Sequence, residues 1–316
     1  MNTSPSSPVH SPATTDRDLP RRPAGGRAVV LGGGGSTGNA WLIGVVAGLF
    51  EGGVDVTAPD LTVGTSAGST VAAQLAGAAP AELLSSILTA TPPERRVPAG
   101  TGRENASNKP VVDHLDRMHA LIASAHDPAD LRRRLGAAAL ARAVASDGSW
   151  QERWRTTVAS RLPGLGWPDR EVLLTAVDAE TGDPVVFDRD SGVDLVDAVA
   201  ASCSSGLPYE IAGRRYLDGG FRRNENADLA AGYERVLVLS PFGGRSLTPP
   251  AWGLQLAAQV EDLRAHGSAV ETVFPGADSE HLFGADAMDV SLRPAAARAG
   301  YEQGLAEAER LTSFWR

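Results

Sequence analysis

Two glycine-rich turns constrain this chain more than any other feature of its sequence. The first follows the apolar run RAVV and reads LGGGGSTG, from Leu31 to Gly38. The second follows the run DLTV and reads GTSAG, from Gly64 to Gly68. Apolar residues at helical spacing come directly after each turn, so the chain opens as strand, helix, strand, helix. This opening predicts an α/β fold with parallel strands and helices across the faces of the sheet.

The remaining sequence divides into a tail, an inserted helical region and a second set of strands. Residues 1–26 are rich in Ser, Pro, Thr and Arg and lack an apolar stretch, which predicts a disordered tail and no secretory signal. Residues 27–316 are expected to form one domain, with a helical insertion at about 91–168. Further strands are expected in REVLLTAVD, DPVVFD, YEIAGRRYLD and ERVLVLSP, and a helix closes the chain.

Composition excludes several classes of function. The formal net charge of -9 argues against binding to nucleic acid, which needs a basic face. Cys203 is the only cysteine, so no internal disulfide can form. No apolar run is long enough to cross a bilayer, and we therefore expect a cytoplasmic protein. No zinc-type cluster of Cys and His occurs, so neither a metal nor another cofactor is expected. The sequence carries no signal for an oligomeric state.

The first glycine turn has three interpretations. It contains G-x-G-x-x-G at Gly33, Gly35 and Gly38, but a dinucleotide site expects an acidic residue at the end of the next strand, where Val63 stands. A P-loop also fails, because no lysine is present in the turn. The amides of Gly33, Gly34 and Gly35 could instead form an oxyanion hole, the alternative being a purely structural turn.

The second turn matches the pattern G-x-S-x-G. A serine on a sharp turn between strand and helix exposes its hydroxyl at the carboxyl edge of the sheet. The flanking Gly64 and Gly68 avoid the clashes that Cβ atoms would make there, and the following helix N-terminus favours an anionic intermediate. Both turns are expected at one sheet edge, where such folds bind ligands. We therefore predict Ser66 as a nucleophile, against the alternative of a plain turn.

A serine nucleophile needs a proton acceptor nearby. None of the chain's histidines lies in a recognisable motif, and only His281 is kept as an alternative base; they are His10, His114, His119, His126, His266 and His281. Asp218 is the stronger candidate, because it ends a short strand and precedes Gly219 and Gly220, which let another loop approach closely. An Asx turn is the alternative explanation for this Asp-Gly pair.

Taken together, these blocks resemble the motifs of the patatin-like phospholipase family of serine lipid acyl hydrolases. GGGGSTG resembles the family's oxyanion loop, GTSAG its nucleophile elbow, and LDGG the block with the catalytic aspartate. TAVDAETGDPVVFD and AASCSSGLPYE resemble two further blocks that lie between the elbow and the aspartate. The resemblance extends from Arg27 to about Ser240. It implies a patatin-like three-layer sandwich, with a mostly parallel central sheet and helices on both faces.

The resemblance also implies roles for individual residues. Ser66 and Asp218 become a catalytic dyad without histidine, and the glycine loop becomes the oxyanion hole. Thr37 stands where the family often has Arg or Lys, which weakens the inference that the substrate is a phospholipid. Asn224-Glu225-Asn226 replaces the family's Asn-x-Pro. The implied function is hydrolysis of lipid acyl esters, of phospholipase A or lipid acyl hydrolase type. An acyltransferase, and a non-catalytic nucleotide-binding or regulatory protein, are the alternatives.

The predicted insertion combines arginines with Trp150, Trp154 and Trp167. One interpretation is a lid or an interfacial surface that makes transient contact with a membrane to draw lipid from it. The other is an ordinary solvated helix face over a local core.

Overall fold

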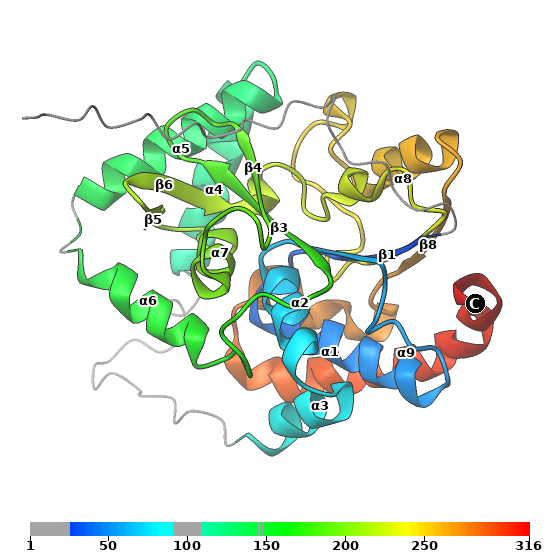
Figure 1. Ribbon diagram of the computed structural model, residues 1–316. Helices are drawn as coiled ribbons and strands as arrows, with labels where there is room; N and C mark the ends of the chain where they lie inside the picture. Colours follow the sequence, from blue (N-terminus) through cyan, green and yellow to red (C-terminus); the bar gives the residue numbers. More distant parts are fainter. Residues whose placement is uncertain (1–25, 91–108, 145, 147) are drawn as a thin grey trace, which may run out of the picture.

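The structure is a computed structural model that describes residues 26–90, 109–144, 146 and 148–316 (Figure 1). The predicted tail therefore lies outside the described residues except for Gly26, and so do residues 91–108 of the predicted insertion.

A single eight-stranded sheet forms the centre of the described fold. Hydrogen-bonded neighbours follow the order β5-β6-β3-β2-β1-β7-β8, and β4 pairs with β3. Five strands run parallel, while β4, β5 and β6 are antiparallel to their neighbours. The strands are β1 Arg27–Leu31, β2 Leu61–Gly64, β3 Glu171–Asp178, β4 Pro184–Phe187, β5 Tyr209–Ile211, β6 Arg214–Asp218, β7 Arg235–Leu239 and β8 Ala269–Val273.

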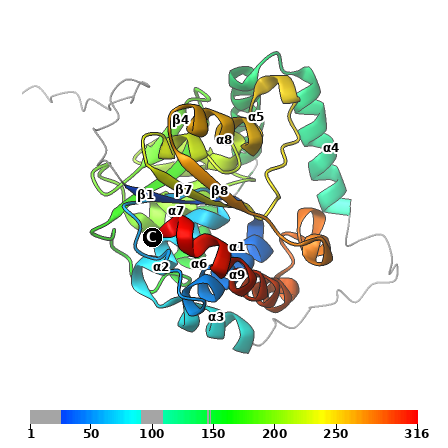
Figure 2. The same cartoon turned by 90° about the vertical axis from the view of Figure 1, so that its right-hand side faces the viewer.

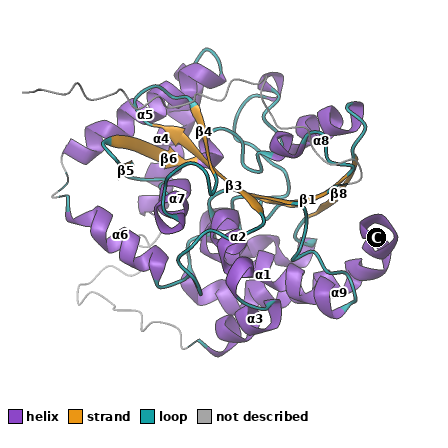
Figure 3. Ribbon diagram, in the orientation of Figure 1, coloured by secondary structure: helices purple, strands orange, loops and turns teal. Residues whose placement is uncertain are grey.

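Helices cover both faces of this sheet, as Figures 1 and 2 show. The α-helices are α1 Gly35–Glu51, α2 Ala67–Gly77, α3 Pro80–Thr89, α4 Lys109–Ser124, α5 Pro128–Val144, α6 Ser149–Ala159, α7 Leu195–Ser202, α8 Leu256–Ala265 and α9 Arg293–Trp315. Short 3-10 turns are η1 Gly219–Phe221, η2 Ala227–Ala230, η3 Pro250–Trp252, η4 Ala277–Leu282, η5 Gly284–Asp286 and η6 Val290–Leu292. The predicted three-layer sandwich is confirmed, with the strands between two layers of helices (Figure 3).

The alternation of side chains along β1 explains the layers. Val29 and Leu31 face the core formed with α1, α2, α7 and α9. Ala28 and Val30 point to the opposite face, where α8 and η2 cover them. Because both faces are buried, the central strands are continuous apolar runs and do not alternate with polar residues. A third cluster packs α4 and α5 against β3 and β6.

The tryptophans of the predicted insertion are packed against the rest of the domain. The indole N–H of Trp154 donates to the carbonyl oxygen of Ala200 at 3.0 Å, and that of Trp167 donates to Val193 at 2.7 Å. The ring of Trp150 lies between Trp154 and Tyr209. These contacts favour the interpretation of a local core beneath a solvated helix face.

No single helix in the described part of the chain is long and apolar enough to cross a membrane. The pair α2 and α3, bent by 118°, meets the requirements of length and composition when the two are taken together.

Helices α1 and α9 approach so closely that glycine is required where they touch. A Cβ atom on Gly300 would lie 2.3 Å from the carbonyl oxygen of Trp41, and one on Gly44 would lie 2.2 Å from that of Ala297. Since both obstacles are backbone atoms, neither can rotate out of the way.

We expect Gly300→Ala to lower the free energy of unfolding by about 1–3 kcal/mol, because the added methyl overpacks the helix pair. Urea denaturation followed by circular dichroism measures the loss. Gly166→Ala is the matched control, since a Cβ atom there meets nothing within 4 Å. Equal stability of the two variants would show that α1 and α9 do not pack this tightly.

Candidate active site

The serine turn is held in a strained conformation at the end of β2. Ser66 caps helix α2 with φ of 52° and ψ of -115°, a region that residues with a side chain rarely adopt. A Cβ atom on Gly68 would lie 1.9 Å from the carbonyl oxygen of Leu31, and one on Gly64 would lie 2.7 Å from the Cα of Ser69. The two glycines thus allow the sharp turn that separates Ser66 from the strand and the helix.

The strand register explains how Asp218 reaches this turn. Leu174 of β3 pairs with both β2 and β4, which must therefore lie on opposite edges of β3. Ala176 pairs with both β4 and β6, so β6 lies on the same edge as β2. Strand β2 is parallel to β3 and β6 is antiparallel to it, so β2 and β6 run towards each other along the same edge. Strand β2 ends at Gly64, which pairs with Leu174, and β6 ends at Asp218, which pairs with Ala176. The two strand ends therefore lie only two residues apart along β3.

Ser66 and Asp218 meet in direct contact. The Ser66 hydroxyl donates a hydrogen bond to Asp218 Oδ2 at 2.7 Å. The other carboxylate oxygen, Oδ1, accepts the backbone N–H of Gly220 at 2.8 Å. Burial raises the pKa of Asp218 to about 6, against the lowering effect of these two hydrogen bonds. The carboxylate is therefore a stronger base than an exposed aspartate and is directed at the serine.

The end of helix α7 supports both residues of this pair. Ser202 Oγ accepts the backbone N–H of Ser66 at 3.0 Å, and the carbonyl oxygen of Ser204 accepts that of Asp218 at 3.0 Å. The Cys203 thiol donates to the carbonyl oxygen of Ser66 at 3.1 Å. Burial, with the nearby charge of Asp218, raises the pKa of this thiol to about 11, so it remains protonated at neutral pH. These contacts lie in the AASCSSG segment, whose individual residues received no role from the sequence.

The glycine loop lies against the serine turn. A Cβ atom on Gly33 would be 3.5 Å from Ser66 Cβ. The N–H of Gly33 donates to the carbonyl oxygen of Asn224 at 3.0 Å, so this amide is already hydrogen-bonded. The amides of Gly34 and Gly35 have no acceptor among the described residues. Of the three glycines predicted for the oxyanion hole, only these two keep an amide free to bind a ligand.

An arginine from a distant element reaches the start of helix α1. Arg293, the first residue of α9, donates to the carbonyl oxygen of Ser36 at 2.7 Å and to Asn39 Oδ1 at 2.9 Å. Burial, with the nearby Arg161, lowers the pKa of this guanidinium to about 10. Thr37, at the position where the family often has a cation, is buried and donates its N–H to Ala287. The sequence offered no local signal for Arg293, because 257 residues separate it from Ser36.

Histidine takes no part in the contacts of Ser66 or Asp218 within the described part of the chain. His281, the alternative base, lies exposed in η4. The side chains of His119, His126 and His266 are likewise exposed, whereas His10 and the side chain of His114 fall outside the described residues. Among the described residues, no group of three or more His, Cys, Asp or Glu side chains could hold a metal ion.

The fold and the site define a class of protein. It is a mostly parallel α/β sandwich that presents a serine–aspartate pair at one end of its central strands, beside a glycine loop. A sequence profile described as patatin-like phospholipase matches residues 29–231, and the chain belongs to this family. The family resemblance predicted from the motifs is thereby confirmed, and membership implies lipid hydrolase activity.

The solved structures that this chain matches include VipD from Legionella pneumophila, with 13% identity and a TM-score of 0.44 over 90% of this chain and 67% of that one. The type III effector protein ExoU has 15% identity and a TM-score of 0.36 over 91% of this chain. ExoU from Pseudomonas aeruginosa, in complex with SpcU, has 17% identity and a TM-score of 0.38, also over 91%. This chain spans 53% of both ExoU chains. No curated protein sequence matches it.

Proposed function

We propose that this protein is a serine hydrolase that cleaves acyl esters of lipids, as a phospholipase A or lipid acyl hydrolase. The observation that carries the proposal is the 2.7 Å hydrogen bond from the Ser66 hydroxyl to Asp218. A buried carboxylate of raised basicity can take the proton of a serine that attacks a carbonyl carbon.

In the first half-reaction, Ser66 Oγ attacks the acyl carbonyl carbon while its proton passes to Asp218. Negative charge develops on the carbonyl oxygen, where the free amides of Gly34 and Gly35 stabilise it, together with the N-terminus of helix α2. The tetrahedral intermediate collapses, the bond to the alcohol breaks, and the alkoxide takes the proton from Asp218. An acyl-Ser66 ester and a free alcohol result.

In the second half-reaction, water attacks the acyl-enzyme and gives its proton to Asp218. The same amides hold the second oxyanion. Collapse of this intermediate releases the fatty acid, and the proton held by Asp218 returns to Ser66 Oγ. One carboxylate thus acts as base and then as acid in each half, and Gly33 contributes indirectly by fixing the loop to Asn224.

The acid limb of the pH profile should fall near pH 6. Only the carboxylate form of Asp218 can accept the Ser66 proton, and its pKa in the folded protein is about 6. We expect kcat/KM for p-nitrophenyl butyrate to be constant from pH 7 to 8 and to fall about tenfold per pH unit well below pH 6. A limb near pH 4, where an ordinary aspartate titrates, would contradict the raised pKa.

The proposed reaction is tested by its products. The wild-type protein is incubated with phosphatidylcholine vesicles and with p-nitrophenyl butyrate, with and without added glycerol. Release of free fatty acid and of nitrophenol supports hydrolysis, whereas acyl glycerol as the main product would identify an acyltransferase. If neither substrate is consumed while a nucleotide binds, the proposal is wrong. Binding to vesicles measured by flotation tests the alternative interpretation of the insertion, in which its helices contact a membrane surface.

A further inference from the structure

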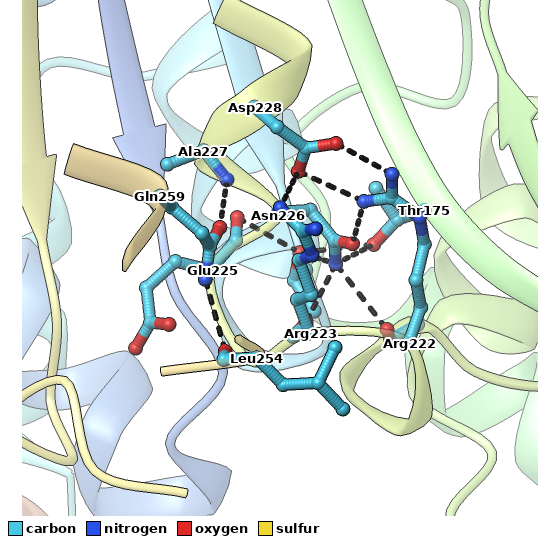
Figure 4. A network of polar contacts seen from close by, with 11 residues as sticks. Thr175, Arg222, Arg223, Glu225, Asn226, Ala227, Asp228, Leu254 and Gln259 are labelled. Carbon is cyan, nitrogen blue, oxygen red and sulfur yellow. Dashed lines mark hydrogen bonds and ion pairs between the residues drawn. The ribbon is translucent and has the colours of Figure 1, made fainter. Parts of the chain in front are cut away.

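Asn226 replaces the proline of the family's Asn-x-Pro pattern and adopts a conformation that proline cannot reach. Its φ is 54° and its ψ is 38°, in the left-handed region that asparagine tolerates better than most residues. Proline is held near a φ of about -65°. Asn226 is fully buried, and its side-chain amide lies within a polar network (Figure 4).

The amide nitrogen of Asn226 lies among four oxygen atoms. It is 3.0 Å from Thr65 Oγ1, 3.2 Å from Thr175 Oγ1 and 3.2 Å from the carbonyl oxygen of Gly219. The fourth is the carbonyl oxygen of Arg223, at 2.7 Å. Two N–H groups are shared among these acceptors.

Three of the four oxygens belong to the place where β2 and β6 meet end to end. Thr65 directly precedes the serine, Gly219 directly follows the aspartate, and Thr175 lies between their partners on β3. Regular ladder pairing stops at this gap, because both strands have ended. The hydroxyls of Thr65 and Thr175 are 2.9 Å apart across it, and the amide of Asn226 lies within reach of both.

An ion pair fixes the direction in which the amide faces. Arg222 donates to Asn226 Oδ1 at 2.7 Å and also holds Asp228 in a bidentate salt bridge. Since a guanidinium can only donate, the oxygen of the amide must face Arg222 and the nitrogen must face the strand ends. Arg223 contacts the same carboxylate at 3.4 Å. The network therefore orients Asn226 without touching Ser66 or Asp218.

We propose that Asn226 is a positioning residue that holds the serine turn and the aspartate turn at the separation the Ser66–Asp218 hydrogen bond requires. The inference rests on the proposed function of that pair. Without the amide, the serine turn stays attached to β2 and the aspartate turn to β6, but the hydrogen bonds from Asn226 to both turns are lost. Displacement of reacting groups by about 1 Å is enough to lower a rate about 100-fold.

The first test is Asn226→Gly, which removes the amide and still permits the left-handed backbone. We expect kcat for p-nitrophenyl butyrate to fall about 10- to 100-fold with KM changed less than threefold. The rate of inactivation by a fluorophosphonate should fall in parallel, because that reaction needs only the serine and its base. Asn226→Asp preserves the size of the side chain but cannot donate to the Gly219 carbonyl oxygen, and we expect the same direction of change.

Asp178→Asn is the control. It weakens the buried ion pair with Arg214 at the start of β6, the end away from Asp218, while the asparagine can still accept the N–H groups of Glu180 and Thr181. We expect its melting temperature to fall while kcat stays within twofold of wild type. Unchanged kcat in folded Asn226→Gly would overturn the inference, and so would losses of kcat that simply follow melting temperature in both variants. A wild-type protein that is not modified at Ser66 would instead disprove the proposed function.

Discussion

Replacement of Ser66 by alanine is expected to reduce kcat/KM for p-nitrophenyl butyrate by about 1000-fold or more, to near the background rate. Serine hydrolases that lose their nucleophile lose catalysis on this scale or larger, because no acyl-enzyme can form. The glycine loop and the carboxylate would remain in place, yet in the proposed mechanism they have nothing to activate without the hydroxyl.

The Ser66→Ala variant should fold normally. Alanine meets the same strain at φ of 52° as serine does, and the backbone N–H of residue 66 can still donate to Ser202. Thermal unfolding checks this point. Ser205→Ala, at an exposed serine close to the same site, is the control and should keep wild-type activity. Hydrolysis by Ser66→Ala within tenfold of wild type would assign the nucleophile to another residue.

Asp218→Asn is expected to lower kcat/KM by roughly 1000- to 10,000-fold, the scale seen when the aspartate of a catalytic triad is changed to asparagine. In the proposed mechanism the carboxylate is the base itself, hydrogen-bonded to the serine at 2.7 Å, and an amide cannot accept the proton. The isosteric side chain can still accept the N–H of Gly220, so the turn should persist.

His281→Ala tests the alternative base and should leave kcat/KM within twofold of wild type, because the imidazole lies exposed in η4. Steady-state kinetics of the two variants side by side separates the possibilities. An active Asp218→Asn enzyme together with an inactive His281→Ala enzyme would assign the base to histidine.

The central part of the fold was predictable because its signals are local. Strands β1, β2 and β7 are apolar runs buried on both faces, and the turns after β1 and β2 carry glycines that the backbone requires. Helices α4, α5 and α6 lie within the helical insertion predicted at about residues 91–168. Strand β8 was missed, because its short sequence AVETV has two polar residues and gains its order from pairing with β7.

Within the site, the two residues that are proposed to react could be predicted from the sequence, but the residues that support them could not. Glycines flank Ser66 and follow Asp218, and these glycines indicate tight turns at both positions. The roles of Ser202 and Arg293 depend on which distant elements pack beside those turns, and a sequence pattern does not contain that information. The sequence also could not show that the amide of Gly33 is not free to bind a ligand. Its N–H donates to the carbonyl oxygen of Asn224, which is distant in the sequence.

Asn226 is an intermediate case. The loss of the expected proline was visible in the sequence, but its meaning depends on the register of β2 and β6 against β3. Departures from a family pattern next to a site residue are therefore useful places to look for supporting contacts.

Covalent labelling with a fluorophosphonate, followed by intact mass measurement and peptide mapping, tests the account most directly. The wild-type protein should gain a single adduct on Ser66, and the same reaction with Asp218→Asn should be slower by at least about 100-fold. No adduct on the wild type, an adduct on another residue, or equal labelling rates of the two proteins would contradict the pairing of this serine with this aspartate.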